Sequence, residues 1–334
     1  MKHIAKFITV LIATLVSVYS QAQVDPHFTQ YYAYPSWLNP ALTGVFDGDY
    51  RVAAAYRTQW GDISSPYSTK GAELEMNTNR PVSIGISLLD QAAGDGGYHY
   101  TTGYASMVFS GVRFDKNGYQ HLNAALQFGF IQRRFDVSKL SFGDQWNPIT
   151  GYNPGTQTAD ILSRTSATSF DAGAGLFYYD ATPGKKANIY GGFAVSHLTQ
   201  PNDQFSTDGA AKLPMRYTLH AGVRIVLSEV LSITPNALFL QQGTAQEKMI
   251  GAYMQMKAVP GTDFLVGANC RLNDAITPYV GFTHDDLVLG LSYDINTSDL
   301  GKLVKGTNSF ELTLSFVGRK TVKTPDAEFI CPRL

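Results

Sequence analysis

Residues 215–228 read MRYTLHAGVRIVLS, and apolar or aromatic side chains occupy every second position. In a β-strand, a period of two places the two sets of side chains on opposite faces, whereas a helix would scatter both sets around its circumference. The stretch therefore predicts a strand with one apolar face and one mostly small or polar face. The apolar face holds Tyr217, Leu219, Ala221, Val223, Ile225 and Leu227, and the other holds Thr218, His220, Gly222, Arg224, Val226 and Ser228.

The same alternation recurs along most of the chain, for example in residues 82–88, 122–130 and 310–316. An even number of strands of about 10 residues, with both ends of the barrel wall on the periplasmic side, is typical of bacterial outer-membrane barrels. We therefore predict an all-β fold, a transmembrane antiparallel β-barrel of the bacterial outer membrane with about 14 strands, in residues 50–320. The predicted strands lie near 50–60, 67–77, 81–90, 98–114, 119–135, 167–180, 186–198, 214–228, 231–242, 247–259, 263–272, 275–284, 287–296 and 308–319.

The lengths of the connections support a barrel, because such proteins have short periplasmic turns and longer outer loops. A soluble two-sheet sandwich or a propeller is the alternative, but long strands and the lack of a blade-length sequence repeat favour the barrel. The outer connection at 273–274 is an exception to the alternation. The predicted inner turns are 78–80, 115–118, 181–185, 229–230, 260–262 and 285–286, and the outer loops include 91–97, 136–166, 199–213 and 297–307.

The first 22 residues are typical of a signal peptide. Lys2 and Lys6 precede an apolar run at 7–18, and Ser20-Gln21-Ala22 is a small-x-small cleavage pattern, which predicts cleavage after Ala22. This run is too short to cross a bilayer as a helix, which takes about 20 residues. A core helix is the alternative interpretation. We expect no transmembrane helix in the mature chain, since no later stretch approaches 18 apolar residues.

Composition argues against several classes of function. The net charge of −1 and the absence of basic runs predict no nucleic-acid partner. Cys270 and Cys331 are too few for a disulfide scaffold and match no zinc pattern, and whether they pair with each other stays open. The histidines His99, His121, His197 and His220 fall in different predicted strands without ligand spacing, and His284-Asp285-Asp286 is expected to be a polar turn. We therefore expect no catalytic residue, no metal and no cofactor, so the protein is not expected to be an enzyme.

Charged residues in the first predicted hairpin point to the lumen. Arg51 and Arg57 share one face of their strand, and Glu73 and Glu75 share the matching face of the next strand. Antiparallel pairing places Arg51 opposite Glu73 or Glu75, where attraction offsets lost hydration. We expect a lumenal charge cluster of all four residues. A structural ion pair and a site for a ligand or peptide in the lumen are both open interpretations.

The stretch PSWLNPALTG, residues 35–44, precedes the first predicted strand. Pro35 and Pro40 exclude a helix interior and a central strand, because proline lacks an amide proton and fixes φ. Packing of Trp37 and Leu38 is therefore expected to order the stretch.

Two longer stretches carry a resemblance to a known family: DPHFTQYYAYPSWLNPALTG at 25–44 and YRTQWGDISSPYST at 56–69. With the leader and the terminal residues 331–334, they resemble the PorP/SprF family of type IX secretion system outer-membrane proteins over essentially the whole chain. The resemblance implies an outer-membrane barrel with a periplasm-side N-terminal segment, residues 23–49, which plugs or braces the barrel mouth or contacts periplasmic partners. We place residues 321–334 in a C-terminal periplasmic tail. It also implies a role in secretion, in surface attachment of exported proteins and, in some members, in gliding motility in Bacteroidota.

The most specific part of the resemblance is Asn39-Pro40-Ala41 with Gly44, followed by Arg57-x-Gln59-Trp60. Together with Trp37, these residues form a candidate partner-binding or barrel-bracing motif. The expected partners are an exported protein, other secretion-system components at the periplasmic face, and outer-membrane lipid. The outer loops are the natural place for choosing the exported protein. A diffusion porin for small solutes and an outer-membrane hydrolase are the alternative classes.

Overall fold

The computed structural model describes residues 25–61, 66–78, 80–94, 97–159, 164–202, 212–299, 301 and 308–319. Fourteen antiparallel strands form a closed barrel in which β1 pairs with β16, as the sequence predicts. The proposed signal peptide, the C-terminal tail and Cys331 lie outside the described residues. The strands of the barrel are β1 (Tyr50–Gln59), β2 (Tyr67–Asn77), β3 (Val82–Ala93), β4 (Tyr98–Arg113), β5 (Gln120–Arg134), β8 (Ser166–Asp180), β9 (Ala187–Ser196), β10 (Arg216–Val226), β11 (Leu231–Gln242), β12 (Ala245–Val259), β13 (Thr262–Arg271), β14 (Ala275–His284), β15 (Leu287–Asn296) and β16 (Ser309–Gly318).

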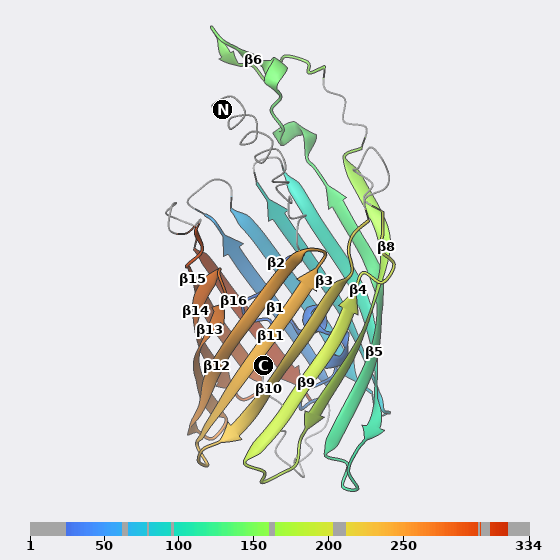
Figure 1. Cartoon of the computed structure of the whole chain (residues 1–334), viewed down its shortest axis with the longest axis vertical. Helices are drawn as coiled ribbons and strands as arrows, with labels where there is room; N and C mark the ends of the chain where they lie inside the picture. The colour runs from blue at the N-terminus through green and yellow to red at the C-terminus, as the bar shows by residue number, and fades with distance from the viewer. Residues whose placement is uncertain are drawn as a thin grey trace, which may run out of the picture.

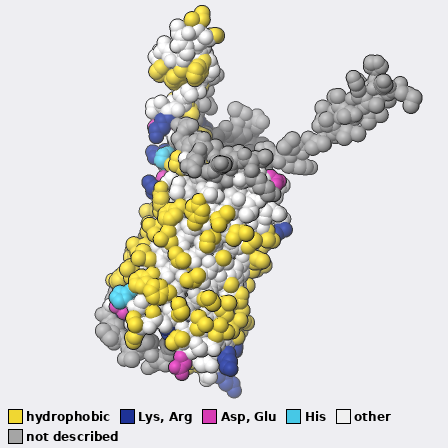
Figure 2. Space-filling model, turned by 90° about the vertical axis from the view of Figure 1, so that its left-hand side faces the viewer, with side chains coloured by type: hydrophobic (Ala, Val, Ile, Leu, Met, Phe, Trp, Pro, Cys, Tyr) yellow, Lys and Arg dark blue, Asp and Glu magenta, His cyan; other side chains and the backbone are white. Residues whose placement is uncertain are grey.

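The period-two pattern separates an outer face from a lumenal face on each strand. In β1, Val52 and Tyr56 are exposed on the outside, whereas Arg51 and Arg57 are buried in the interior. Apolar side chains cover the outer wall between the two ends, and charged side chains gather near those ends (Figure 2). An apolar band on a closed sheet suits a lipid environment, because closure leaves no unpaired strand edge.

The two ends of the barrel differ, and we name them by their connections. The turn end holds the six connections 78–81, 114–119, 181–186, 227–230, 260–261 and 285–286, and it is also where β1 begins and β16 ends. The loop end is the opposite one, at the top of Figure 1. Two loop-end connections are as short as turns, residues 243–244 and 272–274, so the rim is low beside β11–β14.

The long connection between β5 and β8 contains structure that the sequence analysis missed. Two short helices, η2 (Val137–Lys139) and η3 (Gly143–Gln145), precede a two-stranded hairpin of β6 (Trp146–Asn147) and β7 (Gly151–Tyr152). This hairpin stands beyond the loop end (Figure 1). Within the described residues, no helix is long and apolar enough to cross a membrane.

Residues 25–49, which we call the N-terminal segment, run through the interior of the barrel. Asp25 contacts Gln242 and Arg216 at the loop end, whereas Gly44 lies against Ser83 at the turn end. The segment therefore extends through the lumen from one end to the other, which goes beyond the plug or brace expected at one mouth of the barrel. The segment fills the lumen because its aromatic side chains pack against lumenal side chains of the wall, in two buried clusters.

Candidate functional site

The N-terminal segment and the lumenal residues that hold it form the candidate site. Two short helical turns, α2 (Pro35–Leu38) and η1 (Pro40–Leu42), shape the middle of the segment, and a proline opens each one. Proline is tolerated at the first helical position because the N–H that it lacks would have no partner inside the helix. Each proline therefore occupies the first position of a helical turn, whereas at an interior position it would break the turn.

Asn39 joins the two turns and fixes the segment to the wall. Its Oδ1 accepts a hydrogen bond from the Ala41 N–H at 2.9 Å, which caps η1. Its Nδ2 donates to the Leu176 carbonyl at 3.0 Å and lies 3.2 Å from His220 Nε2. A Cβ at position 175 would overlap Asn39 Oδ1, so the glycine there makes room for this close approach. The Asn39-Pro40-Ala41 motif is therefore a buried contact with β8, β9 and β10.

A first charged cluster holds the segment near the loop end of β15 and β16. The fully buried Arg57 donates to Asp294 Oδ2 at 2.7 Å and to Glu311 Oε2 at 3.1 Å. Glu311 also accepts the backbone N–H groups of Thr29 and Gln30, at 2.8 and 2.7 Å. Arg57 therefore braces the segment through a carboxylate that binds two consecutive backbone donors, and such charge-assisted bonds are the stronger kind.

The same cluster extends to β13. Arg271 donates to Asp294 Oδ2 at 2.8 Å and to Thr29 Oγ1 at 3.1 Å, and Arg57 bonds the same hydroxyl. Thr277 adds a bond to Asp294 at 2.8 Å. Residues of β1, β13 and β15 thus bond the side chain of Thr29 in the segment. Asp294 of β15, the carboxylate beside it, also accepts bonds from β1, β13 and β14.

A second charged cluster holds Asp25, the first described residue of the segment. Its Oδ2 lies 2.6 Å from His197 Nε2 and accepts a bond from Arg216 Nη1 at 2.9 Å. Asp171 bonds the other ring nitrogen of His197 at 2.7 Å. Arg216 also donates to the Trp37 carbonyl and lies over the Trp37 ring, 4.6 Å from its centroid. Trp37 is thus a buried packing residue, which favours the barrel-bracing interpretation of the motif over partner binding at this side chain.

A third cluster lies nearer the turn end. Arg51 pairs with Glu75 at 2.8 Å, in the register predicted from the sequence, and its distance to Glu73 is 3.9 Å. Ser36 of the segment donates to Glu73 at 2.5 Å. The single lumenal cluster expected from the sequence is therefore divided. Arg57 pairs with Asp294 and Glu311 of the first cluster, because barrel closure places Glu311 directly opposite it.

The remaining motif residues lie at the two ends. Gly44 has a φ of +81°, a conformation that glycine adopts without strain, and its backbone lies against Ser83 and Asn77. Gln59 ends β1 at the loop end, and Trp60 follows it with a φ of 59° and an edge-on contact to Tyr67, with ring centroids 4.9 Å apart. Gln59 and Trp60 therefore belong to the rim of the first hairpin, and Trp37, Asn39, Pro40, Ala41, Gly44 and Arg57 belong to the interior.

The histidines fit the sequence interpretation in part. His284 is exposed at the β14–β15 connection, as expected for a polar turn. His197 is not in a strand but follows β9, with a φ of 59°. Among the described residues, no group of three or more His, Cys, Asp or Glu side chains is arranged to hold a metal ion. Cys270 lies in β13, and its pairing with Cys331 concerns a residue outside the described ranges.

Sequence reasoning missed the residues that anchor the N-terminal segment. Glu311 had a usable signal, because closing the barrel between the first and last strands places it opposite Arg57. The partners of Asp25 had none, since Gln242 is 217 positions away and each contact depends on where the segment enters the lumen. The missed residues include Asp25, Thr29, Gln30, Asp171, His197, Arg216, Gln242, Arg271, Asp294 and Glu311.

The second cluster predicts a dependence on pH. Burial opposes protonation of His197, but the carboxylates of Asp25 and Asp171 outweigh it and raise the pKa of His197 to about 9. A raised pKa stabilises the fold fully below about pH 6.5, the ordinary histidine value, and this stabilisation is lost as the pH rises through 9. We expect the free energy of unfolding in vesicles to fall by about 2 kcal/mol between pH 7 and 10.

The matched control for this prediction is His197→Gln, which keeps a hydrogen-bonding side chain without the titrating charge. Urea titrations of both proteins at pH 7, 8, 9 and 10 give the difference between their pH profiles. That difference should change most between about pH 6.5 and 9, where the unfolded chain has lost the proton that the folded protein still holds. Parallel profiles would show that His197 is not protonated in the cluster.

The N-terminal segment and the barrel together match a known protein family. Residues 20–316 match the family described as "Type IX secretion system membrane protein PorP/SprF". The chain belongs to the PorP/SprF family. The matched range includes the N-terminal segment and the barrel up to β16, so the family resemblance of the two sequence motifs is confirmed. No curated protein matches the chain.

Solved structures of two toluene transporters and one hydrocarbon channel have a chain path similar to this one. TodX, a Pseudomonas putida toluene transporter, is 10% identical and covers 87% of this chain and 94% of its own, with a TM-score of 0.49. TbuX, the toluene transporter of Ralstonia pickettii, is 8% identical over 83% and 90%, with a TM-score of 0.48. The monoaromatic hydrocarbon channel CymD is 12% identical over 85% and 91%, with a TM-score of 0.45. Likenesses at this level say nothing about what this PorP/SprF protein binds.

Proposed function

We propose that this PorP/SprF protein is a non-enzymatic outer-membrane component of the type IX secretion system that supports secretion or surface attachment of a cognate exported protein. The family match over residues 20–316 carries the proposal. In this proposal the leader is cleaved after Ala22, the turn end faces the periplasm and other secretion components, and the loop end faces outward. The apolar wall contacts lipid, and no cofactor takes part.

The filled lumen favours this role over a diffusion porin. A porin needs a water-filled channel along its axis, whereas here the N-terminal segment spans the interior from Asp25 to Gly44 and is held by three charged clusters. The segment therefore makes the barrel a scaffold for partners at its two ends. More specifically, we propose that the cognate exported protein is a gliding adhesin and that the source bacterium belongs to the Bacteroidota.

Deletion of the gene in the source bacterium tests the proposal. We expect surface proteomics to show loss of one or a few exported proteins, with other outer-membrane proteins at normal levels, and a plasmid copy to restore them. Cell spreading on agar would show whether gliding is also lost. An unchanged set of surface proteins, together with steady ion conductance of the purified protein in planar bilayers, would instead support the porin.

A further inference from the structure

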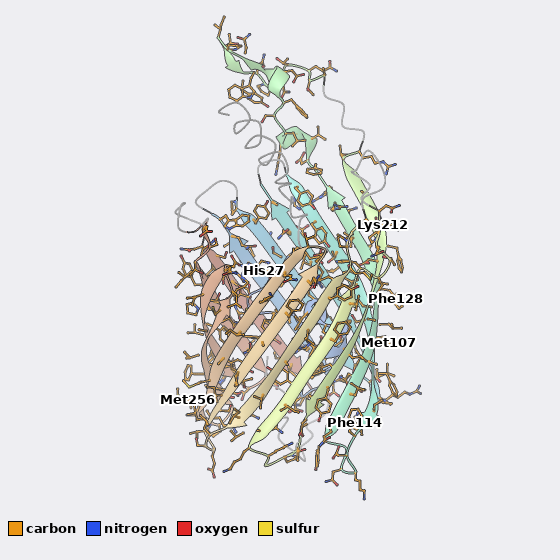
Figure 3. All side chains as sticks on the ribbon, viewed as in Figure 1. His27, Met107, Phe114, Phe128, Lys212 and Met256 are labelled. Atoms are coloured by element: carbon orange, nitrogen blue, oxygen red, sulfur yellow. The ribbon has the colours of Figure 1, made fainter. Side chains whose placement is uncertain are left out.

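A cavity of about 470 Å³ lies at the loop end, between the N-terminal segment and β10–β13. It falls in the size range of small-ligand pockets, about 300–1,000 Å³. The lining includes the two short loop-end connections, after Gln242 and after Arg271, where the rim is low. Figure 3 shows His27, one of the lining residues, close to the loop end of the β11–β12 hairpin. The cavity is therefore placed to receive something from the loop end.

Several side chains that line this cavity carry buried polar atoms with no hydrogen-bond partner among the described residues. Gln242 is only 5% exposed; its Oε1 accepts the Asp25 N–H, which leaves Nε2 as an unpartnered donor. Arg216, 4% exposed, has an unpartnered Nε. Thr218 Oγ1, Glu247 Oε1 and His27 Nε2 complete the set, and the side chains of Glu247 and His27 approach each other only to 3.9 Å. Leaving a buried polar group unsatisfied costs about 1–3 kcal/mol, so the set favours a polar occupant.

Another part of the lining is apolar. Phe28, Tyr31, Leu238 and Leu240 border the same space. An occupant must therefore present both polar groups and an apolar side chain. A peptide does so, because each residue carries one N–H donor and one carbonyl acceptor beside its side chain. Donors at Gln242 and Arg216 match carbonyl oxygens, and the acceptor at Glu247 matches an N–H group.

Other occupants fit less well. Sugars are usually held on the open face of an aromatic ring, but Arg216 covers a face of Trp37, the indole in this lining. A pure hydrocarbon would leave the five polar atoms unsatisfied. Phe28 and Leu38 of the N-terminal segment, which packs inside the barrel, line the cavity, and this argues against passage of a solute through it. The cavity thus suits binding of a chain rather than transport of a solute.

We infer that this cavity binds a short extended segment of an exported protein, with backbone groups bonded to Gln242, Arg216 and Glu247 and an apolar side chain against Leu238 and Leu240. This inference rests on the proposed function, since it names the surface by which the barrel holds its cognate partner. The N-terminal segment then has a second task beyond bracing, because His27, Phe28 and Tyr31 form one side of the binding site.

The test uses the full-length barrel in detergent micelles and the purified exported protein whose surface display is lost on gene deletion. Ala245→Trp adds bulk at a lining position, and Lys248→Trp places the same side chain at an exposed position of β12 outside the lining. We expect Ala245→Trp to weaken binding at least tenfold and Lys248→Trp to stay within twofold of wild type. Heat-modifiable mobility on gels checks that both variants fold.

A second pair of variants tests the polar contact. Glu247→Gln keeps a side-chain acceptor, so binding should stay within about threefold of wild type, whereas Glu247→Leu removes the acceptor and should cost about tenfold. A photo-crosslinking residue at position 245 should attach to one segment of the exported protein. Crosslinks to residues of the barrel chain itself, or wild-type affinity in both Ala245→Trp and Glu247→Leu, would overturn the inference. A deletion that changes no surface protein would instead defeat the proposed function before this test begins.

Discussion

Replacing Arg57 by leucine is expected to lower the free energy of unfolding by about 3–5 kcal/mol, since removal of one partner leaves buried charges uncompensated. The side chain is fully buried and bonds both Asp294 and Glu311. Arg271 still pairs with Asp294 in the variant, but Glu311 keeps only the two backbone donors of Thr29 and Gln30. Urea unfolding in lipid vesicles measures the loss, and limited proteolysis at the N-terminal segment shows whether the segment detaches.

Two further variants separate the charge of Arg57 from its shape. Arg57→Lys keeps the charge but not the fork that reaches Asp294 and Glu311 together, so an intermediate loss is expected. In Arg57→Leu with Glu311→Gln, the unpaired carboxylate is gone, and the double variant should lose less stability than the two single losses added together. Additive losses, or a single variant within 1 kcal/mol of wild type, would contradict the role of this cluster in holding the segment.

The strands of the wall were predictable because each carries its own signal. Strand β2 has the predicted bounds, 67–77, and β10, predicted at 214–228, forms at Arg216–Val226. The alternation of apolar and polar residues shows which face each residue occupies. Because the outer face is apolar and the inner face packs in the interior, a shift in strand pairing by one residue would put every side chain on the wrong face. The pairing of Arg51 with Glu75 followed from the same local information, since a single hairpin joins them.

The path of the N-terminal segment was not predictable in this way. Its partners come from strands far along the chain, so Thr29 bonds Glu311 across 282 positions and Asp25 bonds Gln242 across 217. The positions of Pro35 and Pro40 correctly exclude a long helix or strand, but they do not predict that the segment lies within the lumen. The hairpin at 146–152 was missed for a related reason: its strands have two residues each, too few for a periodic pattern.

Placing an arginine on the outer face of β10 is expected to cost more than any change at the end of that strand. Ala221 is exposed on the outer face at the middle of the strand, and arginine at the bilayer midplane of a barrel costs about 2–4 kcal/mol. Leu227 is also exposed but lies just beyond the strand at the turn end, where the same charge should cost about 0–1 kcal/mol. Depth in the bilayer, rather than the substitution itself, should decide the result.

Refolding titrations into vesicles of Ala221→Arg, Leu227→Arg and Ala221→Leu measure this difference. Ala221→Leu adds an apolar side chain at the same position, so it should stay close to wild type and show that bulk alone is tolerated on the outside. Arg224 points into the interior, and its replacement by leucine should be milder than Ala221→Arg, because no charge enters lipid. Equal losses for Ala221→Arg and Leu227→Arg would mean that the apolar band does not lie in the bilayer. A loss for Arg224→Leu that exceeds the loss for Ala221→Arg would mean that the lumenal contacts of this strand outweigh its exposure to lipid.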